Sequence, residues 1–344
     1  MPLKAHSSAA WTILAGCLLL GQGCSAPSVP VTRTLELPYA HCTLTLNDHA
    51  DDAAFSACFT RIEQVLNRFN MYSPESEVSA VNRAAGSAAV AVSDDFWEVL
   101  GEALKLAELT DGRFDPTVGP LVKLWGIGSD HARVPGPEEI RAALRLIGWR
   151  NIVLDPRAKT VRLPLKGMTL DFGALLKGYA AVQGGLLLSA RGVKSAILDL
   201  GGSVLTLGSQ RGGVPWRIGL QTPGAPRGTP LGVVLTRDEV VNTSGAYEQF
   251  LQAKGRRYQH ILDPHTGYPV DSGVEAVSVI APRLRNADGP TLSIMSLGVT
   301  DGMALAKKLG IEAVIIDTDR KLHMSPGVRS RFTLLDASYS IASP

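Results

Sequence analysis

The sequence predicts an α+β fold in one large domain. Expected helices and strands alternate along the chain without a regular βαβ repeat, which argues against a doubly wound parallel sheet. Hydrophobic residues make up 45% of the 344 residues and charged residues 19%, enough apolar material for a substantial core. No Pro-, Gly- or Ser-rich linker divides the chain after residue 34, so we expect a single domain over residues 35–344.

The N-terminus has the pattern of a secretory signal. An apolar run over residues 9–20 is too short to span a bilayer and ends in small residues before Cys24. We therefore expect a lipoprotein signal peptide over residues 1–23, a tether over 24–34 and lipidation of Cys24. Cys17 fits the lipobox better letter by letter, but cleavage there would leave three leucines exposed on the mature protein. An ordinary cleaved signal peptide is the alternative.

Hydrophobic periodicity predicts the elements of the first half. Apolar residues recur on one face of an expected helix over residues 52–69. Ser93 is a favourable N-cap for a second helix, since two aspartates follow it. Further helices are expected over residues 137–147 and 174–190. Strands are expected over residues 35–46, 152–154 and 160–163.

The second half is richer in strands. They are expected over residues 195–200, 204–207, 216–221, 231–235, 258–261 and 274–280. A helical segment over residues 288–310 then precedes a last strand over 313–317.

Several functional classes are excluded or disfavoured. The net charge of +2, with dispersed basic residues, predicts no nucleic-acid partner. No phosphate-binding P-loop is present, and the G-x-G-x-x-A run starting at Gly21 lies in the signal peptide. The cysteines form no zinc pattern, although Cys42 and Cys58 could pair in an oxidising compartment.

The most informative segment runs over residues 241–270. It joins Thr243, Ser244 and Gly245, which we interpret as a turn, to a strand that carries His260 and then to an Asp263–Gly267 turn. Small residues in turns offer free N–H groups and hydroxyls to phosphate, and a histidine beside them can move a proton near neutral pH. These residues indicate a phosphate-handling site.

The amino-acid sequence of this segment resembles the T-S-G-x-Y…Y-x-H-I-L-D-P-x-T-G-Y-P signature of the ApbE family, the FAD:protein FMN transferases. Residues 112–126 resemble the family block G-x-F-D-P-T-V-G-P-L, and residues 170–179 resemble D-L-G-G-I-A-K-G-Y. Together with residues 71–77, these blocks make the resemblance extend over about residues 35–320. It implies a T-fold-related domain of mixed, largely antiparallel sheets with packed helices.

The resemblance also implies site residues. It assigns Mg²⁺ to Asp288 and to the backbone carbonyl of Ala174, and a proton-accepting or proton-relaying role to His260, for which a structural histidine is the alternative. Asp288 could also be merely a helix N-cap. The residues implied to contact FAD are His41, Tyr72, Arg113, Phe114, Asp115, Asp171, Lys177, Ser244, Gly245 and Ile261.

Three positions depart from the family pattern. His41 stands where the family has a methionine, Ala246 where it has an aspartate, and Leu292 where it has a threonine of the metal site. Thr291 lies one residue earlier, and one helical residue corresponds to about 100° of rotation. The sequence therefore predicts that Thr291 does not simply replace the missing hydroxyl.

The reaction implied by the resemblance is phosphoryl transfer. A Thr or Ser hydroxyl of an acceptor flavoprotein attacks the FMN-side phosphorus of FAD with the help of Mg²⁺, and AMP leaves. The lipid anchor would place the enzyme on a membrane, on the periplasmic side of the bacterial envelope. Alternatives are a metal-dependent FAD hydrolase and a non-catalytic FAD-binding lipoprotein, the latter favoured by Leu292.

Overall fold

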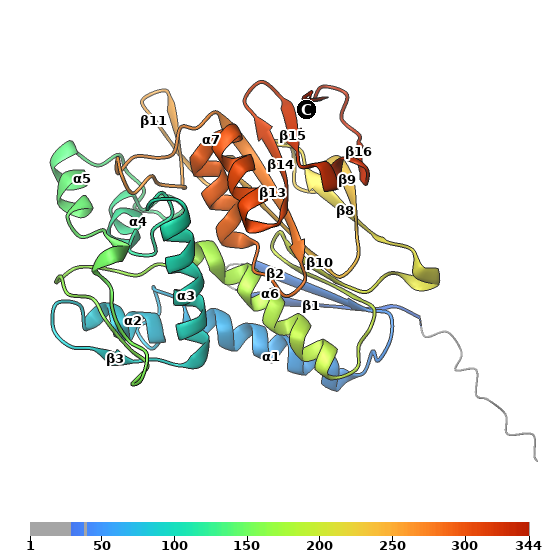
Figure 1. Ribbon diagram of the computed structural model, residues 1–344, viewed down its shortest axis with the longest axis horizontal. Coiled ribbons are helices and arrows are strands. Elements are labelled where there is room, and N and C mark those ends of the chain that lie inside the picture. Colours follow the sequence, from blue (N-terminus) through green and yellow to red (C-terminus); the bar gives the residue numbers. More distant parts are fainter. Residues whose placement is uncertain (1–28, 38–39, 344) are drawn as a thin grey trace, which may run out of the picture.

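A nine-stranded sheet forms the centre of the protein (Figure 1). The computed structural model describes residues 29–37 and 40–343, so the predicted signal peptide and both candidate lipidation sites, Cys17 and Cys24, lie outside the described residues. All neighbouring strands of this sheet are antiparallel except the last pair, which confirms the α+β class. In spatial order the strands are β1 (Val31–Leu37), β2 (Ala40–Leu46), β6 (Ala196–Leu200), β7 (Ser203–Leu207), β10 (Glu239–Gly245), β13 (Val274–Pro282), β14 (Glu312–Asp317), β15 (Lys321–Met324) and β17 (Ser340–Ile341).

Helices cover one face of this sheet. The long helix α6 contacts β6 and β7, α7 contacts β10, β13 and β14, and α1 packs against α6 (Figure 1). None of the helices in the described part of the chain is long and apolar enough to cross a membrane. The helices are α1 (Asp52–Arg68), α2 (Glu77–Arg83), α3 (Asp94–Leu109), α4 (Gly119–Trp125), α5 (Pro137–Leu144), α6 (Gly173–Ala190), α7 (Asp288–Leu309) and α8 (Pro326–Arg329).

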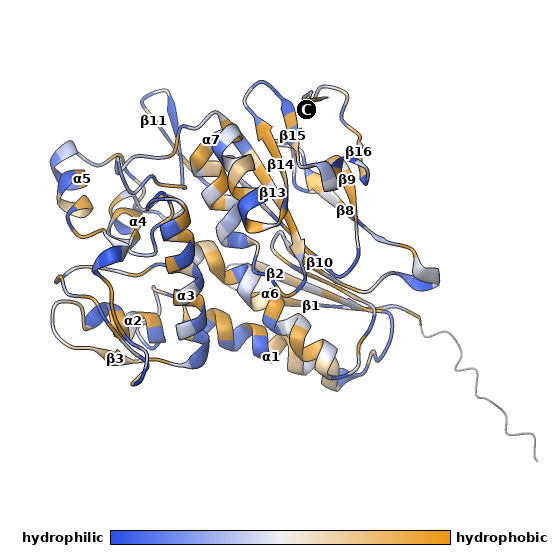
Figure 2. Ribbon diagram, in the orientation of Figure 1, coloured by the Kyte–Doolittle hydropathy of each residue, from blue (hydrophilic) through white to orange (hydrophobic). Residues whose placement is uncertain are grey.

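The opposite face of the sheet is also buried. A three-stranded sheet of β8 (Trp216–Gln221), β9 (Pro230–Thr236) and β16 (Phe332–Leu334) shares a second core with it. Successive residues of a strand point to opposite faces, so Val240 joins the helix-side core and Val241 joins this second core. Burial on both faces explains the apolar colouring of β13 and β14 in Figure 2.

Two smaller sheets complete the molecule. A separate hairpin of β11 (Phe250–Ala253) and β12 (Arg256–Gln259) stands out from the upper part of Figure 1. The other small sheet combines β3 (Val90–Ala91), β4 (Val153–Asp155) and β5 (Thr160–Arg162). Helices α4 and α5 together bury Trp125 in a third, small core.

Local signals in the sequence predicted several elements closely. Helix α1 begins at Asp52, and the carboxylate of its N-cap Asp51 accepts a hydrogen bond from the N–H of Ala54 (2.7 Å). Helix α3 begins after Ser93, whose hydroxyl accepts from the N–H of Phe96 as its capping role predicts.

Other predicted boundaries were wrong. Residues 35–46 form parts of two strands, and β1 begins at Val31, inside the predicted tether. Residues 243–245 are the end of central strand β10 instead of a turn. The ring of Tyr247 folds over Gly245. A Cβ added at position 245 would lie 2.4 Å from a ring carbon, so this position requires glycine. Strand β12 ends at Gln259, so His260 follows the strand.

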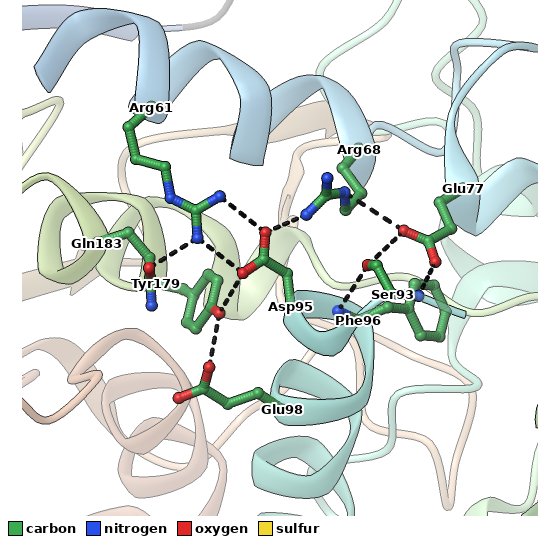
Figure 3. Close-up of polar contacts among 9 residues, drawn as sticks. All are labelled: Arg61, Arg68, Glu77, Ser93, Asp95, Phe96, Glu98, Tyr179 and Gln183. Atoms are coloured by element: carbon green, nitrogen blue, oxygen red, sulfur yellow. Dashed lines mark hydrogen bonds and ion pairs between the residues drawn. The ribbon is translucent and has the colours of Figure 1, made fainter. Parts of the chain in front are cut away.

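An ionic cluster holds α1, α2, α3 and α6 together (Figure 3). Asp95 accepts two hydrogen bonds from Arg61 (2.8 and 2.7 Å) and also pairs with Arg68. The Tyr179 hydroxyl contacts both Asp95 (3.1 Å) and Glu98 (2.8 Å). Hydrogen bonding to Arg61 lowers the pKa of Asp95, so its carboxylate is stabilised in the charged form.

Candidate active site

Asp288 lies at the N-terminal end of α7 and is 3% exposed. Its Oδ1 accepts a hydrogen bond from the Ser203 hydroxyl (2.7 Å), and its Oδ2 accepts from the backbone N–H of Gly178. No Lys, Arg or His forms an ion pair with this carboxylate within the described ranges. Burial raises the pKa of Asp288, and the nearby Lys177 only partly opposes that shift. A buried carboxylate with neutral donors and no bonded cation is suited to receive a metal ion.

Gly178 and Asn286 make this arrangement possible. A Cβ at position 178 would lie 2.3 Å from Asn286 Oδ1 and 2.9 Å from Asp288 Cγ, so only glycine allows α7 to approach α6 this closely. Asn286 Oδ1 accepts from the Asp288 N–H (3.1 Å), and its Nδ2 donates to the Leu175 carbonyl (3.0 Å). Asn286 therefore fixes the position of Asp288 relative to the first turns of α6.

A chain of uncharged polar side chains leads from Asp288 to β10. The Thr291 hydroxyl donates to the Asp288 carbonyl (2.6 Å) and contacts the hydroxyl of Ser244 (2.8 Å). Asn242 donates to Thr291 (3.1 Å) and contacts the Ser203 hydroxyl (2.7 Å). The Thr-Ser-Gly segment therefore belongs to the site, although as a strand end.

The position of Thr291 in this site was not predicted from the sequence. It is fully buried among the polar side chains, whereas Leu292 is only partly buried, against the main apolar core. Its hydroxyl is engaged by the Asp288 carbonyl, so it supports the aspartate from behind without reaching its carboxylate. The sequence predicted that Thr291 would not simply replace a metal-binding threonine at position 292. It did not predict that the Thr291 hydroxyl would support the backbone of Asp288.

Lys177 and His260 face the same region. The Lys177 ammonium donates to the Gly201 carbonyl (3.0 Å), and the N–H of Gly201 donates to the carbonyl of His41 (3.1 Å). The His41 side chain itself is exposed and pairs with Glu36. His41 thus reaches the site through its backbone.

His260 is arranged to accept a proton. Its Nδ1 lies 3.1 Å from the Gln249 carbonyl, which can only accept a hydrogen bond, so Nδ1 carries the proton and Nε2 keeps a free lone pair. Burial lowers the pKa of His260, and the charge of the neighbouring Lys177 lowers it further. The imidazole is therefore neutral near pH 7, the form required of a base.

Two sequence blocks that lie far apart along the chain meet beside this site. Arg113 lies 3.6 Å from Asp263, and the indole N–H of Trp125 donates to the Gly267 carbonyl (2.8 Å). Gly267 has a φ of +76°, and a Cβ there would lie 2.3 Å from Ile140. The loop after α3 and the turn after His260 thus form one packed unit.

Comparison with known proteins identifies the chain. The family model described as "ApbE family" matches residues 39–315. The chain belongs to the ApbE family. A protein of Treponema pallidum named FAD:protein FMN transferase is 37% identical over 301 residues, covering 83% of each chain. One of Klebsiella pneumoniae with the same name is 36% identical over 299 residues, covering 87% of this chain and 92% of its own.

Solved ApbE structures share the fold over most of the chain. The ApbE protein of Thermotoga maritima superposes with a TM-score of 0.81 at 27% identity, covering 88% of this chain and 99% of its own. The flavin transferase ApbE of Vibrio cholerae gives a TM-score of 0.79 at 28% identity, covering 89% of this chain and 100% of its own.

Of the remaining residues implied by the ApbE resemblance, Tyr72 is exposed and Asp171 and Ala174 are half-buried. Tyr72 is 72% exposed and lines a hollow of about 340 Å³, together with Lys123. Asp171 accepts from the N–H of Gly173 (2.8 Å) just before α6, and Ala174 follows in the first turn of that helix. Their contacts with FAD or metal stay predictions.

Phe114, Asp115 and Ile261 are buried instead. Asp115 accepts hydrogen bonds from the N–H and hydroxyl of Thr117 (2.8 and 2.6 Å) and from the N–H of Trp149 (3.0 Å). These bonds make Asp115 an organiser of its loop in this ApbE chain. Ile261 lies in the main core, beside His260 along the chain.

The two cysteines that the structure describes take no part in the site. Cys42 and Cys58 are both buried and hold free thiols. Burial raises the pKa of each thiol to about 12, so neither is a nucleophile at neutral pH.

Proposed function

We propose that this protein transfers FMN from FAD to a Thr or Ser hydroxyl of a target protein and releases AMP. The names of the ApbE relatives support the activity. The observation that carries it in this chain is the buried, uncompensated Asp288 carboxylate, with the charge of Lys177 and the neutral His260 nearby. Together they offer a metal site, a phosphate-directed charge and a base.

The proposed step conserves atoms and charge in a simple way. The acceptor hydroxyl oxygen bonds to the FMN-side phosphorus of FAD, and the bond from that phosphorus to the bridging oxygen breaks. AMP departs with the bridging oxygen, and the hydroxyl proton passes to Nε2 of His260. In this proposal Lys177 contacts the diphosphate and Asp171 holds the cofactor in position.

The donor set fits Mg²⁺ bound together with the substrate. Mg²⁺ typically takes one or two carboxylates, several waters and substrate phosphate oxygens. Asp288 supplies one carboxylate, the Ala174 carbonyl is the proposed second ligand, and no cluster of three or more His, Cys, Asp or Glu suited to a metal occurs among the described residues. When bound there, Mg²⁺ would neutralise charge on the diphosphate. We therefore expect tight metal binding only in the presence of FAD.

We also propose that Cys24 carries a lipid that anchors the protein to a membrane on the periplasmic side of a bacterial envelope. The apolar run over residues 9–20, followed by small residues before this cysteine, supports the proposal. Mass spectrometry of the N-terminal peptide from the full chain tests it. A diacylated Cys24 supports the anchor, while an unmodified peptide beginning elsewhere contradicts it.

The activity is tested with residues 29–344, FAD, Mg²⁺ and a threonine-bearing acceptor domain. In-gel flavin fluorescence of the acceptor with an equal amount of AMP would establish the transferase. AMP without a labelled acceptor would instead favour FAD hydrolysis. FAD that stays intact, with Mn²⁺ as well as Mg²⁺, would favour a binding protein that lost its metal site, as Leu292 suggests.

A further inference from the structure

The β11–β12 hairpin is joined directly to the proposed base. Strand β12 ends at Gln259, one residue before His260. Both the N–H and Nδ1 of His260 lie 3.1 Å from the carbonyl of Gln249, the residue before β11. Whatever binds the hairpin is therefore held beside His260.

The two faces of the hairpin differ. Residues paired across the two strands share a face, so Leu251 and Tyr258 lie on one face and Phe250 and Gln259 on the other. Tyr258 packs against Trp125, with ring centroids 5.5 Å apart, and this face rests on the body. Phe250 on the other face is 46% exposed, and the Arg257 guanidinium lies 4.0 Å from its ring centroid. Exposed aromatic and arginine side chains are the types enriched in protein interfaces.

The hairpin concentrates positive charge on a protein that is nearly neutral. Residues 250–259 include Lys254, Arg256 and Arg257, all exposed, and no Asp or Glu, while the whole chain has a net charge of only +2. Arg257 lies on the Phe250 face, whereas Arg256 lies on the Tyr258 face, 5.3 Å from the centroid of that ring, with Asp271 as an acidic partner at 3.9 Å. Strand β12 of the hairpin, with the sequence Arg-Arg-Tyr-Gln, is correspondingly hydrophilic in Figure 2. Such a patch attracts an acidic partner.

The backbone of the hairpin is also available. The sheet has two strands, and among the described residues no other strand pairs with β11. Its outer edge therefore offers N–H and C=O groups to an extended chain.

We propose that the β11–β12 hairpin binds an acidic, extended segment of the acceptor protein and thereby presents the neighbouring Thr or Ser hydroxyl to His260. This inference rests on the proposed transferase function and names the partner chemistry of the same site. The hairpin supplies recognition, while FAD and the metal are held elsewhere, by α6, α7 and β10.

The test uses three versions of one threonine-bearing acceptor domain, in which the residues flanking the threonine are Asp/Glu, Ser/Gly or Lys/Arg. We expect the acidic version to have a KM at least tenfold below that of the basic version, and added salt to reduce the difference. The hairpin variant Arg256→Gln/Arg257→Gln should raise the KM for the acidic version about tenfold and leave FAD binding unchanged. Arg257→Lys keeps the positive charge and should therefore keep most of the difference in KM between the acidic and basic versions.

A matched control removes the same charge elsewhere. Arg211→Gln/Arg217→Gln neutralises two exposed arginines on and near β8, which lies on the other side of Figure 1 from β11. This control should keep the KM of the unmodified protein.

The outcomes separate the two proposals. If no version is labelled and no AMP appears, the transferase function fails. If all three versions are labelled with equal KM, or the hairpin variant keeps its preference, the transferase stands and the hairpin proposal is wrong. Loss of binding to phosphatidylglycerol vesicles in the hairpin variant, with an unchanged acceptor KM, would assign the patch to a membrane and also overturn the proposal.

Discussion

Two aspartates of this protein, the half-buried Asp95 and the buried Asp288, are held in opposite ways. Asp95 lies between two arginines, and hydrogen bonding to Arg61 lowers its pKa (Figure 3). Asp288 receives only neutral donors, and burial raises its pKa. The first carboxylate is compensated within the fold and serves to join helices. The second forms no ion pair within the described residues, and the charge of nearby Lys177 only partly opposes its pKa shift, which supports the proposal that a metal ion binds there.

Replacing Asp288 should have the largest effect on activity. Asp288→Asn keeps the size of the side chain but removes the charge that would hold Mg²⁺, so we expect FMN transfer to fall about a thousandfold. Rates of AMP release and acceptor fluorescence measure the effect, and EDTA should reduce the unmodified protein similarly. A variant that retains a tenth or more of the rate would contradict the metal-binding role.

His260 tests the same site from its other side. His260→Ala should keep FAD binding and slow transfer about a hundredfold, because the acceptor hydroxyl loses its base. His323→Ala is a suitable control, since that histidine pairs with Asp317 on another part of the sheet.

The pH profile sharpens this prediction. Burial lowers the pKa of His260 below its ordinary 6.5, so the rate of the unmodified protein should fall only below that pH. Unchanged transfer by His260→Ala would show that the residue is structural.

The two aspartates should also differ in their effects on stability. Asp95→Asn breaks a compensated ion pair and should lower the free energy of unfolding by about 3 kcal/mol. Asp288→Asn removes an uncompensated buried charge and should leave the free energy of unfolding unchanged or raise it when metal and FAD are absent. Urea unfolding of both variants at pH 7 measures the two free energies of unfolding. Equal losses in the two variants would contradict the proposed difference between Asp95 and Asp288.

Lowering the pH should change the contributions of Asp95 and Asp288 to stability in opposite directions. The lowered pKa of Asp95 gives stability that is present above the ordinary value of 3.8 and is lost as the pH falls through the native pKa. The raised pKa of Asp288 gives stability that is present below 3.8 and is lost as the pH rises through its native pKa. The advantage of Asp288→Asn should therefore grow from pH 4 toward pH 7.

The smallest expected effect belongs to Thr291. Thr291→Val keeps the shape but leaves Asn242, Ser244 and the Asp288 carbonyl without its hydroxyl, at a cost of about 1–2 kcal/mol of stability. Thr291→Ser should recover most of this loss in the same unfolding assay. If valine is tolerated without cost, the hydroxyl does not support Asp288.

Local rules predicted well where the cause was local. The N-cap Ser93 lies next to the helix that it caps, and the apolar residues of α1 and of α3 recur every three or four residues, so short segments of the sequence contain these signals. The Thr-Ser-Gly segment was misread as a turn because its place in the sheet depends on its partners β7 and β13.

The sequence by itself determined the fold class, the main helices and the blocks that join this chain to the ApbE family, because periodicity, capping and motif spelling are properties of short segments. The tertiary structure decided which groups surround Asp288. Ser203 reaches it from 85 positions away and the N–H of Gly178 from 110, and the raised pKa of the aspartate arises from burial that only the assembled helices and sheet create.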